Sequence, residues 1–395
     1  MAVIIEQEPF STFTPSGNPV VFTFSSDQTA QANFSYLVEV YVNGVIEGRQ
    51  QVFPESGVYG RIDCTSFAER FTSAPSISST FSVDAANYAE IYIKVIERYG
   101  DPIADGANAT SGTTPTVFKA SMSNVDFINW DSSNYVYDVG ITNNKIFTTF
   151  PVGETAKCGE GEQFRLMMLA DSSIEDMDIE FFDSNDVAVT GGSIPVAVAK
   201  IIIVNVGLKN LLADGTVNQA TIDASAYYVI NFSNTTFGAD SEPFRIDIDR
   251  ECNSATSKRL HFISPWGTIE SFTYSLPSTT SGGVISNRFT KEFGSFNGAN
   301  YEFDLSSGTN IDYRKRSNKN LLIRSNWLSE EIQQWLEYYV SMSPLSFIED
   351  TDDVNLGLRR ISISKSQFLF KTIKENTLFK EELTIVLDSH NSMTL

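Results

Sequence analysis

The chain has 395 residues, of which 42% are hydrophobic, 12% aromatic and only 19% charged, and its formal net charge at pH 7 is −21. So acidic a balance argues against a nucleic-acid-binding protein, whose surface needs clustered Lys and Arg. Many aromatic residues and few charged ones favour short strands over long charged helices. We therefore expect a mainly β protein, and the length allows two or three antiparallel β-sandwich-like modules.

The first patterned segment predicts a β-hairpin. Apolar residues occupy every second position from Phe34 to Val42, and this period of two places them on one face of a strand. Asn43-Gly44 follows at once, and this dipeptide suits the positive φ angles of a type I′ turn. Residues 89–95 repeat the alternation and predict a second buried strand of the same N-terminal module, residues 1–115.

Residues 101–116 are rich in Gly, Pro, Ser and Thr and predict a loop that ends this module. An acidic middle module is expected at 116–240. Its densest carboxylate cluster, at 171–186, allows two interpretations: a calcium loop, because hard cations need several oxygen ligands, or a solvated turn between strands. The spacing does not match an EF-hand, so we favour the turn.

The C-terminal module, residues 241–395, contains one substantial predicted helix at about 329–342. Ser329 is a good N-cap, acidic residues follow it in the first turn, and Pro344 lies just beyond the end. Apolar residues at helical spacing, Trp335 among them, predict that one face of this helix is buried.

No set of catalytic or metal-binding residues emerges from the sequence. The chain has two histidines, His261 and His390, and no G-x-S-x-G or H-E-x-x-H motif. Its three cysteines are widely spaced and form no C-x-x-C pair, so neither a zinc site nor a redox motif is indicated. His261 lies in "KRLHFISPWGTIESFTYS", which predicts two strands joined by a Pro265-Trp266-Gly267 turn. We expect no catalytic residue, no metal and no cofactor.

Two groups of residues are candidates for contact with a subunit or a ligand. Trp130 and Trp266 are each a candidate platform for stacking on a sugar, and the alternative for both is packing within the protein. The stretch "YRKRSNK" at 313–319 is the one basic cluster of an acidic chain and predicts an exposed loop or a subunit contact. Its candidate contact residues are Arg314, Lys315, Arg316 and Lys319.

Several stretches together are similar to a known family. They include "SGNPVVFTFSS" near the N-terminus, "FRIDIDRECNSATSKRLHFISPWGTIESFTYS" in the third quarter, and "NLLIRSNWLSEEIQQWLEYYVSMSPLSFIED" after it. Their order resembles tail or baseplate-type virion proteins of tailed bacteriophages, particularly those infecting Bacteroidota. The family's turn reads more like "FLNxxGG", where this chain has "FISPWG", so no residue role is carried over. The ending "KTIKENTLFKEELTIVL" resembles the family more closely.

The resemblance implies a structural virion protein without enzymatic activity, in the distal tail or baseplate. We expect a homo-oligomer that contacts other tail proteins and does not bind nucleic acid or insert into a membrane. The start "MAVIIEQEPF" lacks signal-peptide features, so we expect synthesis in the host bacterial cytoplasm and a place in the virion. The alternatives are a tail protein that binds a host receptor or glycan, a capsid-decorating or head–tail connector protein, and a glycan-degrading enzyme.

Overall fold

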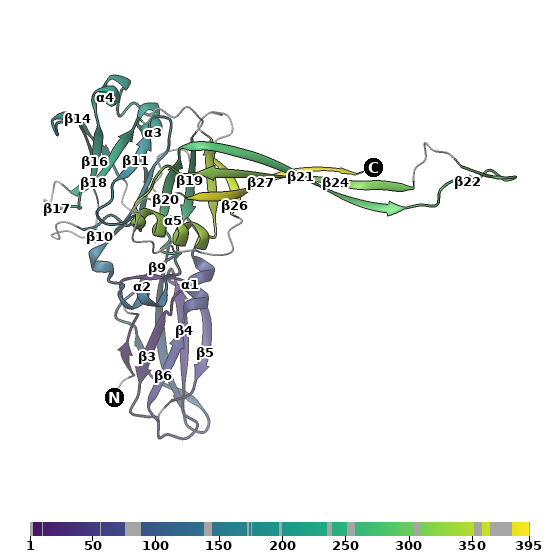
Figure 1. Ribbon diagram of the computed structural model, residues 1–395. Coiled ribbons are helices and arrows are strands. Elements are labelled where there is room, and N and C mark those ends of the chain that lie inside the picture. The colour runs from purple at the N-terminus through teal and green to yellow at the C-terminus, as the bar shows by residue number, and fades with distance from the viewer. Residues whose placement is uncertain are drawn as a thin grey trace. The chain divides into compact units, whose positions relative to one another are not determined.

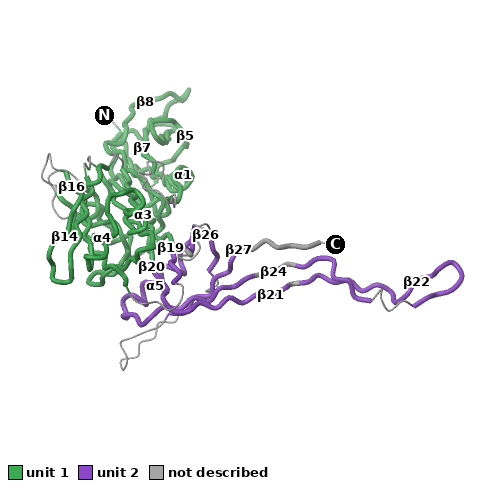
Figure 2. The backbone as a smooth tube through the Cα atoms, turned by 90° about the horizontal axis from the view of Figure 1, so that it is seen from above, with its two compact units in different colours: residues 1–251, 262–271 green, residues 252–261, 272–395 purple. Residues whose placement is uncertain are grey.

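The chain forms two compact units, residues 1–251 with 262–271 and residues 252–261 with 272–395 (Figures 1 and 2). Strands dominate both, so the prediction of a mainly β protein is confirmed. None of the helices in the described part of the chain is long and apolar enough to cross a membrane. The structure, a computed structural model, describes residues 3–9, 11–55, 57–75, 88–137, 144–171, 174, 176–196, 200–234, 239–250, 257–303, 309–350, 358–363 and 381–394.

The N-terminal part of the first unit is a β-sandwich. Its smaller sheet, in the order β1-β3-β6, consists of Ile4–Gln7, Val21–Ser25 and Tyr59–Asp63. Its larger sheet has the order β2-β9-β7-β4-β5, with β8 paired to β7. In chain order these strands are β2 Phe13–Pro15, β4 Ser35–Val42, β5 Val45–Val52, β7 Tyr88–Tyr99, β8 Ala104–Thr110 and β9 Thr116–Phe118. Side chains of both sheets share one buried cluster.

The predicted hairpin is confirmed at β4 and β5, where the alternate residues from Phe34 to Val42 are buried. Asn43 and Gly44 have φ angles of 50° and 80°, as a type I′ turn requires. The predicted loop at 101–116 is wrong in part, because it contains β8, which pairs with β7. Gly106 and the small residues beside it signal a turn in the sequence, but an edge strand tolerates them.

The middle part of the first unit is a second sandwich. A three-stranded sheet, β10-β12-β15, consists of Val136–Tyr137, Arg165–Ala170 and Ile201–Asn205. The opposite sheet has the order β11-β18-β16-β13-β14, with β17 paired to β16. In chain order its strands are β11 Ala156–Gly159, β13 Asp176–Phe182, β14 Ala188–Pro195, β16 Tyr227–Asn234, β17 Ala239–Asp240 and β18 Phe244–Asp249. Most strand pairs are antiparallel, but β2–β9, β10–β12 and β11–β18 are parallel.

A further buried cluster joins the two sandwiches of the first unit. It contains Phe13 and Phe118 from the N-terminal sandwich, Met167 and Ile203 from the second sandwich, and Trp130 from the segment between them. These apolar side chains are removed from water on both sides, so the two sandwiches pack as one body. The predicted module boundaries at 115 and 240 remain predictions. The boundary at 240 would assign β18 to the last module, but β18 pairs with β16 in the sheet of the middle sandwich.

The second unit is built on a seven-stranded sheet in the order β20-β19-β25-β26-β27-β24-β21. Two of its strands, β21 and β24, have 15 residues each, and together with the 13-residue β27 they run far beyond the four other strands of the same sheet (Figure 1). In chain order the strands are β19 Lys258–Ile263, β20 Ile269–Tyr274, β21 Leu276–Thr290, β24 Asn310–Arg324, β25 Ser346–Asp350, β26 Leu358–Ile363 and β27 Glu382–Thr394. Between β21 and β24, β22 (Ser295–Phe296) pairs with β23 (Tyr301–Glu302).

Helices are short except for α5, Glu330–Met342, which confirms the helix predicted at 329–342. Ser329 accepts a hydrogen bond from the backbone N–H of Ile332, as expected of an N-cap. Trp335 is buried on the predicted apolar face. The remaining helices are α1 Thr65–Phe71, α2 Asn124–Ile128, the 3₁₀ turn η1 Ser132–Asn134, α3 Leu208–Ala213 and α4 Gln219–Ala224.

Candidate interaction site

The two candidate tryptophans lie in one aromatic cluster of the first unit. Trp130 is buried, stacks on Tyr135 with ring centroids 5.3 Å apart, and meets Trp266 edge to face at 5.9 Å. Phe147 contacts both tryptophan rings. A sugar needs an exposed ring face, so Trp130 is not available for stacking. Trp266 is half-buried at the predicted turn, where Gly267 has a φ of +82°.

The histidine of the same segment is enclosed. His261 lies in β19, fully buried, with its Nε2 atom 3.3 Å from Oε2 of Glu349 in β25, which is buried as well. A substrate could reach this pair only if the sheet opened. The predicted strand position of His261 is confirmed, and its lack of a catalytic role remains a prediction. His390 lies in β27, and its side chain is outside the described residues.

Among the described residues, Cys64 and Cys158 are buried, and neither forms a disulfide. Burial, with a smaller contribution from the charge of Asp63, raises the pKa of the Cys64 thiol to about 12. That thiol is therefore protonated at neutral pH and a poor nucleophile. Cys252 lies outside the described residues.

The acidic segment at 171–186 surrounds β13, and several of its carboxylates have partners within the protein. Asp183 accepts hydrogen bonds from the backbone N–H groups of Asn185 and Val187 in the turn that leads to β14, and these bonds lower its pKa. Asp186 accepts one from the hydroxyl of Tyr227 at 2.8 Å. Across the described parts of the chain, no group of three or more Asp, Glu, His or Cys side chains could hold a metal ion.

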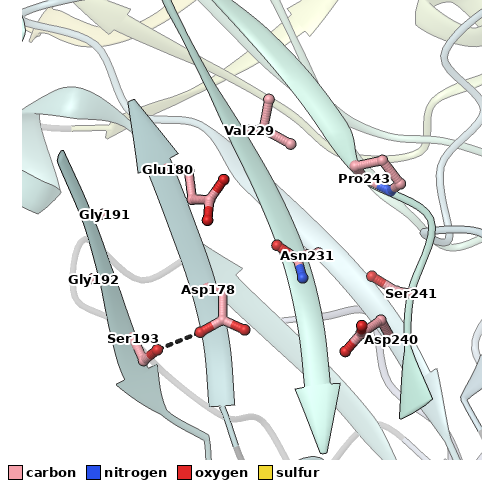
Figure 3. A pocket seen from close by; sticks show the side chains of 10 residues that line it. All are labelled: Asp178, Glu180, Gly191, Gly192, Ser193, Val229, Asn231, Asp240, Ser241 and Pro243. Atoms are coloured by element: carbon pink, nitrogen blue, oxygen red, sulfur yellow. Dashed lines mark hydrogen bonds between the residues drawn. The ribbon is translucent and has the colours of Figure 1, made fainter. Parts of the chain in front are cut away.

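A polar groove of about 610 Å³ lies on the outer face of the same sheet (Figure 3). The acidic side chains that line it are Asp178 and Glu180 of β13 and Asp240 of β17, and the lining contains no Lys, Arg, His or Cys. Asp178 accepts hydrogen bonds from Ser193, drawn in Figure 3, and from Ser233 at 2.6 Å. The groove can attract cationic groups, but its lining holds no nucleophile paired with a histidine base.

The basic cluster at 313–319 is not a loop, contrary to the sequence prediction. Arg314, Lys315, Arg316 and Lys319 lie in β24, which pairs with β21 on one side and β27 on the other. Backbone pairing on both sides makes this segment a strand. The sequence does not reveal it, because four Lys and Arg residues interrupt the alternation of apolar and polar side chains that predicts a strand. The side chain of Arg316 is outside the described residues.

The basic side chains that are described form an open charged surface. Lys315 and Arg288 lie 3.1 Å and 2.6 Å from the two carboxylate oxygens of Asp312, and both cations hold the pKa of this carboxyl below its ordinary value. Lys319 is exposed. Asp312 carries one negative charge and faces two cations, so these basic side chains keep an excess of positive charge. An acidic partner could neutralise that excess.

Sequence reasoning missed the residues beyond this basic stretch. We define the arm as residues 282–319, bounded by the paired residues Gly282 and Lys319. It carries exposed aromatic side chains along β21, β24 and the turn between them, where the sequence is rich in Gly, Asn and Ser. These exposed aromatic residues are Phe289, Phe293, Phe296, Tyr301, Phe303 and Tyr313. The sequence signal that could have revealed them is the high frequency of aromatic residues in this segment.

Comparison with known proteins identifies no family for this chain. No protein-family model matches, and no curated protein matches. Among solved structures, a titin fragment has a TM-score of 0.26 at 12% identity and covers 63% of this chain and all of that one. A titin structure with three Ig domains has a TM-score of 0.19 at 8% identity, covering 81% and 94%. With TM-scores this low, these likenesses carry no argument about function.

Proposed function

We propose that the chain is a structural virion protein of a tailed phage, a distal tail or baseplate component that assembles into a symmetric oligomer and holds neighbouring tail parts. The observation that carries this proposal is the arm. A ribbon of two or three strands that extends past its own sheet buries little apolar surface within its own chain. Large aromatic side chains exposed together on such a ribbon are typical of a surface that meets a protein partner.

The charge distribution supports the same proposal. The arm has six Lys and Arg against four Asp and Glu, a net charge of +2, whereas the rest of the chain has 22 against 45, a net charge of −23. Two unlike surfaces on one chain suit a heterologous interface, in which one patch meets a different patch on the next copy, and such interfaces form rings when the rotation between copies closes. Rings are the arrangement that a tail component needs.

The alternative, a tail protein that binds a host receptor or glycan, now depends on fewer residues. Trp130 is buried, and Trp266 packs against Trp130 and Tyr135. Trp266 stays a candidate contact because this residue is only partly buried. A glycan array would decide this alternative, since sub-millimolar binding to one sugar, lost in Trp266→Ala, would favour it.

The location of the protein on intact particles tests the main proposal. Gold-labelled antibodies against the chain should decorate the distal end of the tail, and image averaging should show several symmetric copies there. Decoration of the head or the neck would favour the capsid-decorating or connector alternatives. A protein that accumulates in infected cells but is absent from purified particles would overturn the proposal.

A further inference from the structure

Exposed aromatic side chains are concentrated on the arm. Among the residues that the structure describes, nine aromatic side chains are exposed, and six of them lie in the 33 described residues of the arm. Phe296 and Phe303, near its far end, are 66% and 67% exposed. Scattered apolar residues on a surface need no explanation, but a contiguous group of this kind marks an interaction site.

The end of the arm is a defined hairpin. The backbone N–H of Asn297 donates to the carbonyl oxygen of Asn300 at 3.1 Å, and the Asn297 side chain accepts from the N–H groups of Ala299 and Asn300. Phe303 stacks on Phe293 with ring centroids 5.4 Å apart. The hairpin backbone and the Phe303 ring are therefore held in place before any partner arrives, which lowers the entropy cost of binding.

The arm also presents an unpaired strand edge. In the described sheet β21 is the outermost strand and pairs with β24 alone. Gly282, Gly283 and Val284 in this strand are exposed and carry neither charge nor proline, the devices that usually protect an edge. Such an edge can accept a further strand or a polar surface of another chain through its backbone groups.

Charge indicates which partner the arm fits. The basic strand of the arm would be complemented by an acidic partner, and the rest of this chain has a net charge of −23 against +2 for the arm, so every copy carries such an acidic excess. We propose that the arm docks on the acidic body of a second copy of this chain, with Phe296 and Phe303 as the apolar anchors and the basic residues of β24 as the charged rim. This inference rests on the proposed function, because it specifies how the oligomer forms.

The test is self-association of the full chain measured by sedimentation velocity over a range of concentrations. The variant Phe296→Ser with Phe303→Ser removes both anchors from positions that are already exposed, so folding should be unaffected. Phe53→Ser is the matched control, because Phe53 is 65% exposed but lies outside the arm. We expect the wild type and Phe53→Ser to associate alike, and the double variant to need at least about tenfold more protein.

Each other outcome has a defined meaning. Equal association of the double variant and the wild type, or an equal loss in Phe53→Ser, would overturn the docking role of the arm. A wild type that stays monomeric at all concentrations and associates only with another virion protein or a polysaccharide would overturn it as well. The proposed function is tested separately. If virus particles lack the protein, the proposed function is refuted, even if purified chains associate through the arm. If the double-variant protein enters particles normally, only the docking role of the arm is refuted.

Discussion

Trp130 donates its indole N–H to the backbone carbonyl oxygen of Phe13 at 2.8 Å, although 117 residues separate them in the sequence. Phe13 lies in β2, an edge of the N-terminal sandwich, and Trp130 follows α2. Both side chains are buried in the cluster that joins the two sandwiches of the first unit. This contact therefore stabilises the junction between the sandwiches.

Two substitutions separate the hydrogen bond from the packing. Trp130→Phe removes the N–H and leaves a buried carbonyl oxygen without it, so we expect a loss of about 1–3 kcal/mol in the free energy of unfolding. Trp130→Ala also removes the ring and should cost about 3–5 kcal/mol. Urea unfolding measures both. Trp327, which is exposed, provides the control Trp327→Ala. A loss for Trp130→Ala no larger than that of the control would contradict this role.

The sequence predicted the elements whose signal is local. The alternation from Phe34 to Val42, the Asn43-Gly44 turn and the capped helix after Ser329 were all found where expected, because each depends on residues within a few positions. The junction around Trp130 could not be predicted, since its partners come from segments far apart in the chain.

The candidate site shows the same division. The basic residues stand out as a cluster in the sequence, but their strand and the arm around it were not predicted. Ser281–Val284 contain two glycines, and the turn near Asn297 is rich in small polar residues, so local propensity indicates a loop. The long register between β21 and β24 overrides that propensity. Pairing between distant segments is information that one sequence does not display.

The turn at Gly267 offers a second prediction. Its φ is +82°, and a Cβ atom there would lie 2.2 Å from the carbonyl oxygen of Lys119. Gly215 has a similar φ of +80°, but its Cβ would have open space. Gly215→Ala should therefore cost about 1 kcal/mol from backbone strain alone. Gly267→Ala should cost about 1–3 kcal/mol more, because backbone must move.

Thermal or urea unfolding of the two alanine variants gives the difference directly. Each variant loses one glycine at a positive φ, so the conformational cost cancels in the comparison. If both variants lose the same free energy of unfolding, Lys119 and its neighbours move aside without cost. The close approach of the turn to Lys119 would then not contribute to stability.

A third prediction concerns Glu270, a fully buried carboxyl group. Burial raises its pKa, while hydrogen bonds from Thr268, Thr149 and Thr148 act in the opposite direction without cancelling the effect. The Thr149 backbone N–H and the Thr268 hydroxyl donate to its Oε1 atom at 2.7 and 2.6 Å. These bonds connect Glu270 to residues 148 and 149 of the first unit, to which residues 262–271 also belong.

The raised pKa fixes the sign of the pH dependence. The folded state binds the proton of Glu270 more tightly than the unfolded state does, so this group destabilises the fold increasingly as pH rises from its ordinary pKa of 4.5 through the raised value. Glu270→Gln lacks this titration. The stability of the wild type relative to Glu270→Gln should thus be greatest at acidic pH and fall as pH rises, measured by urea unfolding at several pH values. Glu69→Gln, at an exposed position, is the control and should not show this pH dependence. If the stability of the wild type relative to Glu270→Gln increased with pH, the assignment would be contradicted.

The last prediction concerns the basic strand of the arm. If Lys319 faces an acidic neighbour, Lys319→Glu should weaken self-association about two- to fivefold at low salt, because one exposed attraction becomes a repulsion. Lys145→Glu changes the net charge equally at an exposed position outside the arm and serves as the control. Raising the salt concentration should screen the attraction, weakening the wild type and bringing it closer to Lys319→Glu. Sedimentation velocity at two salt concentrations would measure this. Identical salt dependence in the wild type and both variants would show that β24 does not meet the acidic surface.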